Sequence, residues 1–166
     1  MDLKSALKKL EGSRDFKKWR QKNKKDFFSY AFKIPQEMSS EWQIGFYDAK
    51  KDRITTFVIG ETSIKIRPEE EVFKREESKI SEVKIDKVKV AFDNALEKAE
   101  EFQSKNFPNN KSIKTIAILQ NMQSLGNIWN ITYITESFNT LNMKIDASTG
   151  KVVEHNFASI LSFRKE

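Results

Sequence analysis

The chain has no cysteine, one histidine, five glycines and three prolines among its 166 residues. The lack of cysteine excludes disulfides, thiolate metal sites and a cysteine nucleophile. The glycines are well separated, so no glycine-rich loop is present that could hold phosphate groups. These absences remove several common classes of enzyme from consideration.

Long apolar runs are also missing from the sequence. None approaches the ~20 residues that span a bilayer, and the N-terminus lacks the apolar stretch of a secretory signal. As it stands, the sequence favours a cytoplasmic protein, and an extracytoplasmic location stays open if a leader was removed. Without cysteine, the redox compartment is undetermined.

Residues suited to catalysis or metal binding are few. The single histidine, His155, falls within a strand pattern, where a surface position is expected. The acidic runs Glu69–Glu71 and Glu100–Glu101 lack the spaced oxygen ligands and the turn glycine of a calcium loop. We therefore expect no enzyme activity, no catalytic residue, no metal site, no cofactor and no small-molecule substrate.

What the chain does have is apolar residues and charge in good supply. Hydrophobic residues make up 38% and aromatic residues 11%, enough for a core, while 33% are charged with both signs interspersed. The net charge of +6 is carried entirely by residues 1–26, which hold ten basic and four acidic side chains. Electrostatic attraction to an anionic partner would therefore centre on this segment.

The first half of the chain predicts a helical segment followed by four strands. Apolar residues at helical spacing run from Leu3 to Trp19, and Gly12-Ser13 divides the helix in two before it ends near Asp26. Alternating patterns then predict strands at 27–34, 42–48, 53–59 and 62–67, the last ending before Pro68. In the first strand, Phe28, Tyr30 and Phe32 are expected on one side.

The second half shows the same order of elements. An apolar stripe predicts a helix over 84–105, and strands are expected at 112–119, 128–136, 140–146 and 151–160, with a turn at 124–127. A gapless shift of 87 residues tests whether the halves repeat. It places Trp42, Ile44, Phe46, Ile54 and Val58 on Trp129, Ile131, Tyr133, Leu141 and Ile145.

This match indicates an internal duplication of architecture. The alternative is that two amphipathic hairpins with equal turn lengths align by chance.

One segment also resembles a known family. The sequence Leu-Gly-Asn-Ile-Trp129-Asn-Ile-Thr-Tyr133, followed by Leu-Asn-Met-Lys-Ile-Asp146-Ala-Ser-Thr149-Gly150-Lys-Val-Val153, resembles the PepSY domain over about residues 84–160. In its Asp-x-x-Thr-Gly turn, Asp146 can accept backbone N–H groups and Gly150 can supply a positive φ. The first half departs from this pattern, with Asp48-Ala-Lys-Lys-Asp52 between strands and Gly60 where the Asp-x-x-Thr-Gly turn should begin, so its membership is inferred from the repeat.

The resemblance implies a cystatin-like α+β fold and no active site. Relatives of this family include propeptides of thermolysin-type metallopeptidases, secreted proteins and membrane-anchored regulators, where restraint of a partner is suspected. We accordingly expect two tandem cystatin-like units, each a helix on an antiparallel sheet of about four strands. Residues 1–72 form the first, 73–83 connect them and 84–166 form the PepSY-like second.

Two functions follow as hypotheses. The first is a non-enzymatic interaction module that binds or restrains a protein partner, such as a peptidase, through a strand edge or the concave sheet face. The second is binding of nucleic acid or an anionic membrane by the basic N-terminal helix, unless its apolar residues cover the sheet and its lysines only contact solvent. The oligomeric state is left open. The candidate basic residues are Lys8, Lys9, Arg14, Lys17, Lys18, Arg20, Lys22, Lys24 and Lys25.

Overall fold

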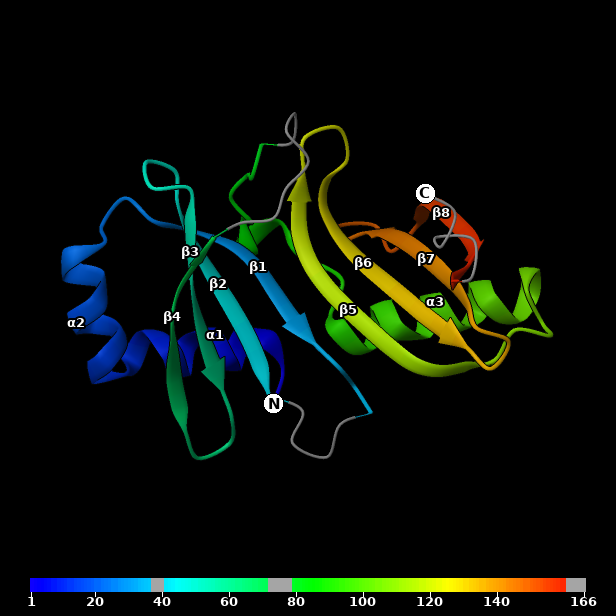
Figure 1. Cartoon of the computed structure of the whole chain (residues 1–166), viewed down its shortest axis with the longest axis horizontal. Coiled ribbons are helices and arrows are strands. Elements are labelled where there is room, and N and C mark those ends of the chain that lie inside the picture. The colour runs from blue at the N-terminus through cyan, green and yellow to red at the C-terminus, as the bar shows by residue number, and fades with distance from the viewer. Residues whose placement is uncertain (37–40, 72–78, 161–166) are drawn as a thin grey trace.

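A computed structural model describes residues 1–36, 41–71 and 79–160, which form an α+β fold built on one antiparallel sheet (Figure 1). The sheet has eight strands in the order β4-β3-β2-β1-β5-β6-β7-β8. The elements in chain order are α1 (Leu3–Gly12), α2 (Arg14–Lys22), β1 (Phe27–Lys33), β2 (Trp42–Asp48), β3 (Arg53–Ile59), β4 (Ile64–Glu71), the short 3-10 helix η1 (Ile85–Lys87), α3 (Phe92–Asn106), β5 (Ser112–Met122), β6 (Gly126–Thr135), β7 (Asn139–Asp146) and β8 (Val152–Ser159).

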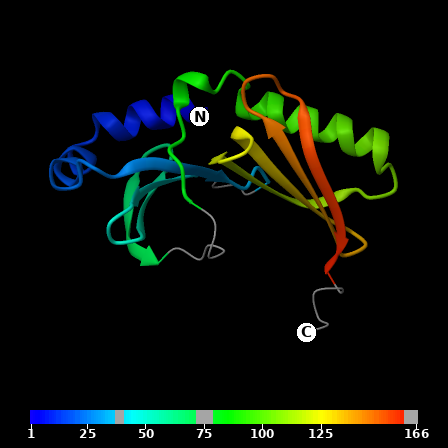
Figure 2. The same ribbon diagram turned by 90° about the horizontal axis from the view of Figure 1, so that it is seen from above.

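The sheet is arched, and the helices lie on its convex side. Figure 2 shows α1, α2 and α3 above the arch, with the outer strands at both ends bending away from them. We call the opposite side of the sheet the concave face. The hydrophobic core lies between the helices and the convex side, where α1 and α2 contribute Leu3, Leu10 and Phe16. The expectation that the apolar residues of the N-terminal helix face the sheet is therefore confirmed.

The predicted break in the N-terminal helix is confirmed at Ser13. Its hydroxyl donates to the carbonyl of Leu10 and accepts from the N–H of Phe16, so one residue ends α1 and caps α2. Asp2 caps the start of α1 by accepting from the N–H of Ser5. The basic helical segment therefore ends at Lys22, four residues before Asp26.

The two inner strands, β1 and β5, join the halves of the sheet. They pair antiparallel from Tyr30 opposite Gln120 to Lys33 opposite Ala117. On the convex side, Ala31 and Ala117 are small and fully buried, which leaves space above these strands for large side chains from their neighbours.

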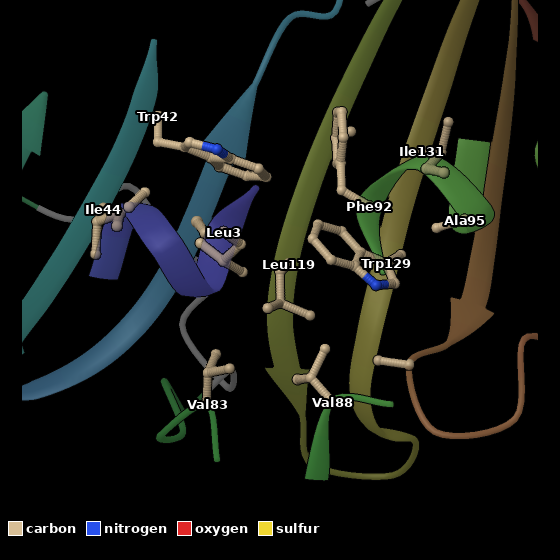
Figure 3. Close-up of a cluster of buried hydrophobic side chains, with 14 of the residues drawn as sticks. Leu3, Trp42, Ile44, Val83, Val88, Phe92, Ala95, Leu119, Trp129 and Ile131 are labelled. Carbon is tan, nitrogen blue, oxygen red and sulfur yellow. The ribbon is translucent and has the colours of Figure 1, made fainter. Parts of the chain in front are cut away.

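Aromatic rings fill this space. Trp42 of β2 and Trp129 of β6 approach to 6.4 Å between ring centroids, and Phe92 of α3 lies 5.0 Å from the first and 5.6 Å from the second (Figure 3). Their indole N–H groups are satisfied by the carbonyls of Met1 and Val90. The core is therefore continuous across the junction between β1 and β5.

One prediction about β1 is wrong. The register between β1 and β2 shifts between Phe28 and Tyr30, so the strand contains a bulge at Ser29. Phe28 packs in the core, whereas Tyr30 and Phe32 lie on the concave face, because an extra residue in a strand reverses the alternation beyond it.

The gapless repeat also fails in its second strand. The shift of 87 holds for β2 and β6, where Ile44 and Ile131 are both in the core. In the next strands, β3 and β7, Trp42 pairs with Ile59 and Trp129 pairs with Ile145. Ile59 therefore corresponds to Ile145, and the shift between these strands is one residue smaller. Val58, which the shift placed on Ile145, lies on the concave face. The two hairpins therefore differ by one residue in length.

Several element boundaries differ from the predicted ones; strand β5, for example, runs to Met122 instead of ending at Leu119. The second helix begins at Phe92 instead of Lys84, because residues 85–87 form the 3-10 helix η1 and the N–H groups of Lys89 and Val90 donate to the carbonyl of Ala147. Strand β4 continues past Pro68 to Glu71. A proline is tolerated there because β4 is an edge strand, whose outward N–H groups need no partner in the sheet.

The predicted connection lies partly outside the described residues, which resume at Lys79. From there the chain crosses one end of the inner strands: Ser81 bridges to Asn121, and the N–H of Val83 donates to the carbonyl of Phe28.

Candidate interaction surfaces

The concave face carries no charged side chain at its centre, over strands β2, β1, β5 and β6. Strand register places Gln43, Phe32, Ile118 and Asn130 side by side across β2, β1, β5 and β6. The neighbouring row of Gly45, Tyr30, Gln120 and Ile128 runs parallel to it. Most of these side chains are half-buried, while α1, α2 and α3 lie on the other side of the sheet (Figure 2). The centre of the arch is thus formed by aromatic, aliphatic and amide groups.

A tyrosine lies across a glycine near the middle of this face. A Cβ atom on Gly45 would lie 2.1 Å from Cε1 of Tyr30, so the ring occupies the space that any other residue at position 45 would need. The Tyr30 hydroxyl is 2.8 Å from the Thr56 hydroxyl, and burial raises the pKa of Tyr30. The tyrosine is therefore held in place over β2 and β3.

A small amide network lies on the other side of the centre. The side-chain nitrogen of Asn142 donates to Asn130 Oδ1 at 2.6 Å and to Thr132 Oγ1 at 2.8 Å. The amide nitrogen of Asn130 and the carbonyl oxygen of Asn142 take no part in these two contacts and keep their hydrogen-bonding capacity. Such groups suit the backbone amides of a docked chain.

Charged side chains border the concave face at both ends. At one end, Lys65 pairs with Val58 in register, and Arg67 donates to Gln43 Oε1 at 3.0 Å. At the other end, Lys144 and Glu154 form an ion pair at 2.9 Å. The face therefore has an uncharged centre and a charged rim, the arrangement found at protein interfaces.

Sequence reasoning missed these concave-face residues. The available signal was that Asn130, Thr132 and Asn142 lie within strong strand patterns, although asparagine is depleted in strands. Register between strands, which brings the three together, is not visible in the pattern of a single strand.

The nine candidate basic residues of the N-terminal segment do not form a single surface. Lys9 donates to the carbonyls of Gly60 and Glu61 at 2.7 and 2.6 Å, and so ties α1 to the turn before β4. The guanidinium of Arg20 lies over the rings of Phe16, Trp19 and Phe46, and donates to the carbonyl of Asp26 at 2.6 Å. These two residues support the fold, while seven stay exposed: Lys8, Arg14, Lys17, Lys18, Lys22, Lys24 and Lys25.

The aromatic residues of α2 are engaged in the core. Phe16 and Trp19 contact Phe46 and Phe57 with centroid distances between 5.1 and 5.3 Å. They are therefore not exposed platforms on which nucleic-acid bases could stack.

The Asp-x-x-Thr-Gly turn has the expected local geometry. Oδ1 of Asp146 accepts from the N–H groups of Ser148 and Thr149, both at 2.8 Å, and Gly150 has φ of 77°. The hydrogen bond from the Ser148 hydroxyl, at 2.7 Å, is the largest of several that lower the pKa of Asp146. Ala147 in this turn is fully buried and its carbonyl accepts from the N–H groups of Lys89 and Val90, so the turn also anchors the segment before α3.

His155 is exposed on β8 but has aromatic neighbours. Its ring centroid lies 5.0 Å from that of Phe102 and 6.0 Å from that of Phe107, and Phe107 stacks on Phe157 at 5.0 Å. Within the residues that the structure describes, no three histidine, aspartate or glutamate side chains gather where a metal ion could bind.

No known family model matches the sequence, and no curated protein matches it. Among solved structures, the chain is similar to a "putative lipoprotein" from Clostridium difficile 630, with a TM-score of 0.56 and 11% sequence identity. The similarity covers 86% of this chain and 90% of that chain. At this identity it shows a shared fold. Of the helices formed by the described residues, none is both long and apolar enough to cross a membrane.

Proposed function

We propose that the chain is a non-enzymatic binding module that docks a protein partner on its concave face. The observation that carries this proposal is the uncharged centre with its charged rim. Protein interfaces are depleted of charge and enriched in aromatic residues at their centre, which matches Tyr30, Phe32 and Ile118 between the ends marked by Arg67 and Lys144.

The composition of this face favours a protein over an anionic polymer as the partner. Binding to phosphates depends on many lysine and arginine contacts. The exposed lysines of the N-terminal segment belong to the helices on the convex side and to the loop after them, away from the concave face (Figure 2). A protein segment that offers apolar side chains and backbone amides fits the concave face better.

We further propose that the fold consists of two tandem cystatin-like units, the second PepSY-like. In support, each half supplies a helical segment followed by four consecutive strands, and Trp42 and Trp129 occupy matching places in β2 and β6. The formed Asp146–Gly150 turn agrees with the PepSY motif. Under this proposal a peptidase is the partner class to test first, and the lipoprotein description of the structural neighbour favours an extracytoplasmic location.

The proposal is tested with a panel of thermolysin-type metallopeptidases. Purified protein should slow cleavage of a peptide substrate, and the variants Ile118→Arg and Thr132→Arg should weaken this effect at least tenfold by placing charge in the centre of the face. Phe138→Arg is the matched control, because Phe138 is 63% exposed in the turn between β6 and β7. If no peptidase is bound or slowed, the partner class is wrong; if binding survives both concave-face variants, the surface is wrong.

A second candidate function is binding of an anionic surface by the exposed lysines. It is favoured by the cluster of Lys17, Lys18, Lys22, Lys24 and Lys25 near the end of α2, all of which are exposed. Affinity for single-stranded DNA or anionic vesicles should then fall steeply with salt and be lost in the triple charge reversal of Lys17, Lys18 and Lys22 to Glu. Charge reversal of Lys87 and Lys89 to Glu, two exposed lysines just before α3, should leave that affinity unchanged. An affinity that is the same in both variants would contradict this function.

A further inference from the structure

The two edges of the sheet differ in how well they are protected against pairing with another strand. Natural sheets protect their edges with proline and with charged side chains. Strand β4 follows this rule, since its eight residues include Pro68 and five charged side chains. Strand β8 has no proline, and its single carboxylate, Glu154, is held by Lys144 at 2.9 Å.

The pairing of β8 with β7 shows which of its backbone groups point outward. The N–H of Ile160 donates to the carbonyl of Phe138, and this pair continues the register in which Ala158 lies opposite Thr140 and Asn156 opposite Asn142. Hydrogen-bonded pairs alternate along an antiparallel ladder. The N–H and C=O groups of His155 and Phe157 therefore point away from β7, and the described part of the chain places no strand beside them.

Two large apolar side chains of this strand are exposed to solvent. Val153 is 46% exposed and Phe157 is 37% exposed. Phe157 stacks on Phe107, and His155 lies against Phe102, so the edge carries an aromatic strip on its convex side. An added strand would lie beside this strip and place its own side chains next to it.

We propose that the β8 edge pairs with the β8 edge of a second copy of the chain, antiparallel and about a two-fold axis at Asn156. In this register His155 of each copy lies opposite Phe157 of the other, and their outward N–H and C=O groups form four backbone hydrogen bonds. Glu154 lies opposite Ala158, so no like charges meet. The aromatic strips of the two copies become continuous, and the sheet extends through both molecules.

A second copy fits this edge because the surface is complementary to itself. An isologous contact requires that one patch match its own image, and β8 does so in charge, in hydrogen bonding and in apolar side chains. The surface proposed above for a protein partner is the concave face and not the β8 edge. This pairing is therefore independent of the proposed function.

Proline substitution tests the pairing without breaking the intrachain ladder. His155→Pro removes an outward N–H that β7 does not use, whereas His155→Ala removes the same imidazole and keeps the N–H. In analytical ultracentrifugation from low micromolar to near-millimolar protein, the native chain and His155→Ala should dimerise, and His155→Pro should stay monomeric. A native chain that is monomeric throughout, or a dimer that His155→Pro leaves intact, overturns the proposal.

A disulfide provides a second test that does not depend on tolerance of proline. In the proposed register the two Asn156 residues face each other in a non-hydrogen-bonded pair, where Cα atoms are about 4.5 Å apart and a disulfide can form. Because the chain contains no cysteine, Asn156→Cys introduces a single thiol per molecule. It should give a covalent dimer quantitatively on mild oxidation, while Lys65→Cys on the β4 edge should not. Equal crosslinking of the two variants, or none for Asn156→Cys, overturns the proposal.

Discussion

The contact between Tyr30 and Gly45 explains why one glycine lies in the interior of a buried strand. Glycine weakens a strand because it contributes no side chain to packing. Here the Tyr30 ring covers the position, and a Cβ would lie within 2.1 to 2.8 Å of three ring atoms. The neighbouring aromatic side chain thus supplies the packing that Gly45 lacks.

Gly45→Ala should destabilise the protein by about 1–3 kcal/mol, because the Tyr30 ring has to move away from β2. The same substitution in a Tyr30→Ala background should cost much less, since the space is then open. Urea unfolding of the two single variants and the double variant measures the coupling as a double-mutant cycle. Additive effects would show that the ring and the glycine are not linked in this way.

A second residue that should affect stability measurably is Asp26, which lies just before β1 and is 7% exposed. Burial is the main cause that raises its pKa, and the nearby charge of Asp48 adds to it. A folded-state pKa above the unfolded value means that the ionised form is disfavoured in the folded protein. Stability therefore decreases as pH rises from the unfolded pKa through the folded pKa.

Asp26→Asn should consequently raise the thermal midpoint at neutral pH, and this gain should shrink as the pH falls below the folded pKa of Asp26. Asp48 is the control of opposite sign: its pKa is lowered, first of all by the hydrogen bond from the Lys50 N–H. Asp48→Asn should therefore lower stability at neutral pH, with the loss shrinking in acid. Thermal unfolding from pH 7 to pH 3 checks both variants, and a neutral-pH loss of stability in Asp26→Asn would contradict the assignment.

At the scale of elements, the turn between β7 and β8 shows how one side chain fixes a hairpin. Asp146 accepts two backbone N–H groups and the Ser148 hydroxyl, and Gly150 closes the turn with a positive φ. The turn also places the Ala147 carbonyl against Lys89 and Val90, just before α3. Both β8 and the start of α3 therefore depend on the turn.

Asp146→Ala should cost about 1–3 kcal/mol, because two backbone donors lose their charged acceptor. Amide hydrogen exchange should increase in the turn and also at Lys89 and Val90. Ser148→Ala, which removes only the hydroxyl contact, should have a smaller effect on both. Exchange that increases in the turn alone would contradict the link to α3.

The sequence predicted the elements that depend on local signals. Ser13 as a helix cap, the strand β3 at 53–59 and the Asp146 turn are each determined by residues within a few positions of one another. The bulge at Ser29 and the extension of β4 past Pro68 depend instead on the neighbouring strands, and the prediction was wrong at both. The concave face was missed for the same reason, since it exists only once register between strands is set.

At the scale of the molecule, the aromatic junction of Trp42, Phe92 and Trp129 decides whether the halves behave separately. Phe92 belongs to α3 but contacts Trp42 of β2, and Lys33 of β1 lies over the Trp42 ring at 4.9 Å. Burial lowers the pKa of this lysine, as expected for an ammonium group at the edge of a core. With β1 and β5 paired beneath, the halves share one core and one sheet.

Phe92→Ala should therefore destabilise the whole molecule by about 3–5 kcal/mol, since it leaves a cavity between the two indoles. Unfolding should stay a single transition in which far-UV circular dichroism and tryptophan fluorescence coincide, because both halves lose the same contacts. Phe102→Ala is the matched control on the same helix, where the half-buried ring contacts β8 instead of the junction. It should lower stability less and leave the fluorescence of the folded state unchanged, because Trp42 and Trp129 keep their packing. A biphasic curve in Phe92→Ala, with one half unfolding at its original midpoint, would show that the halves fold independently.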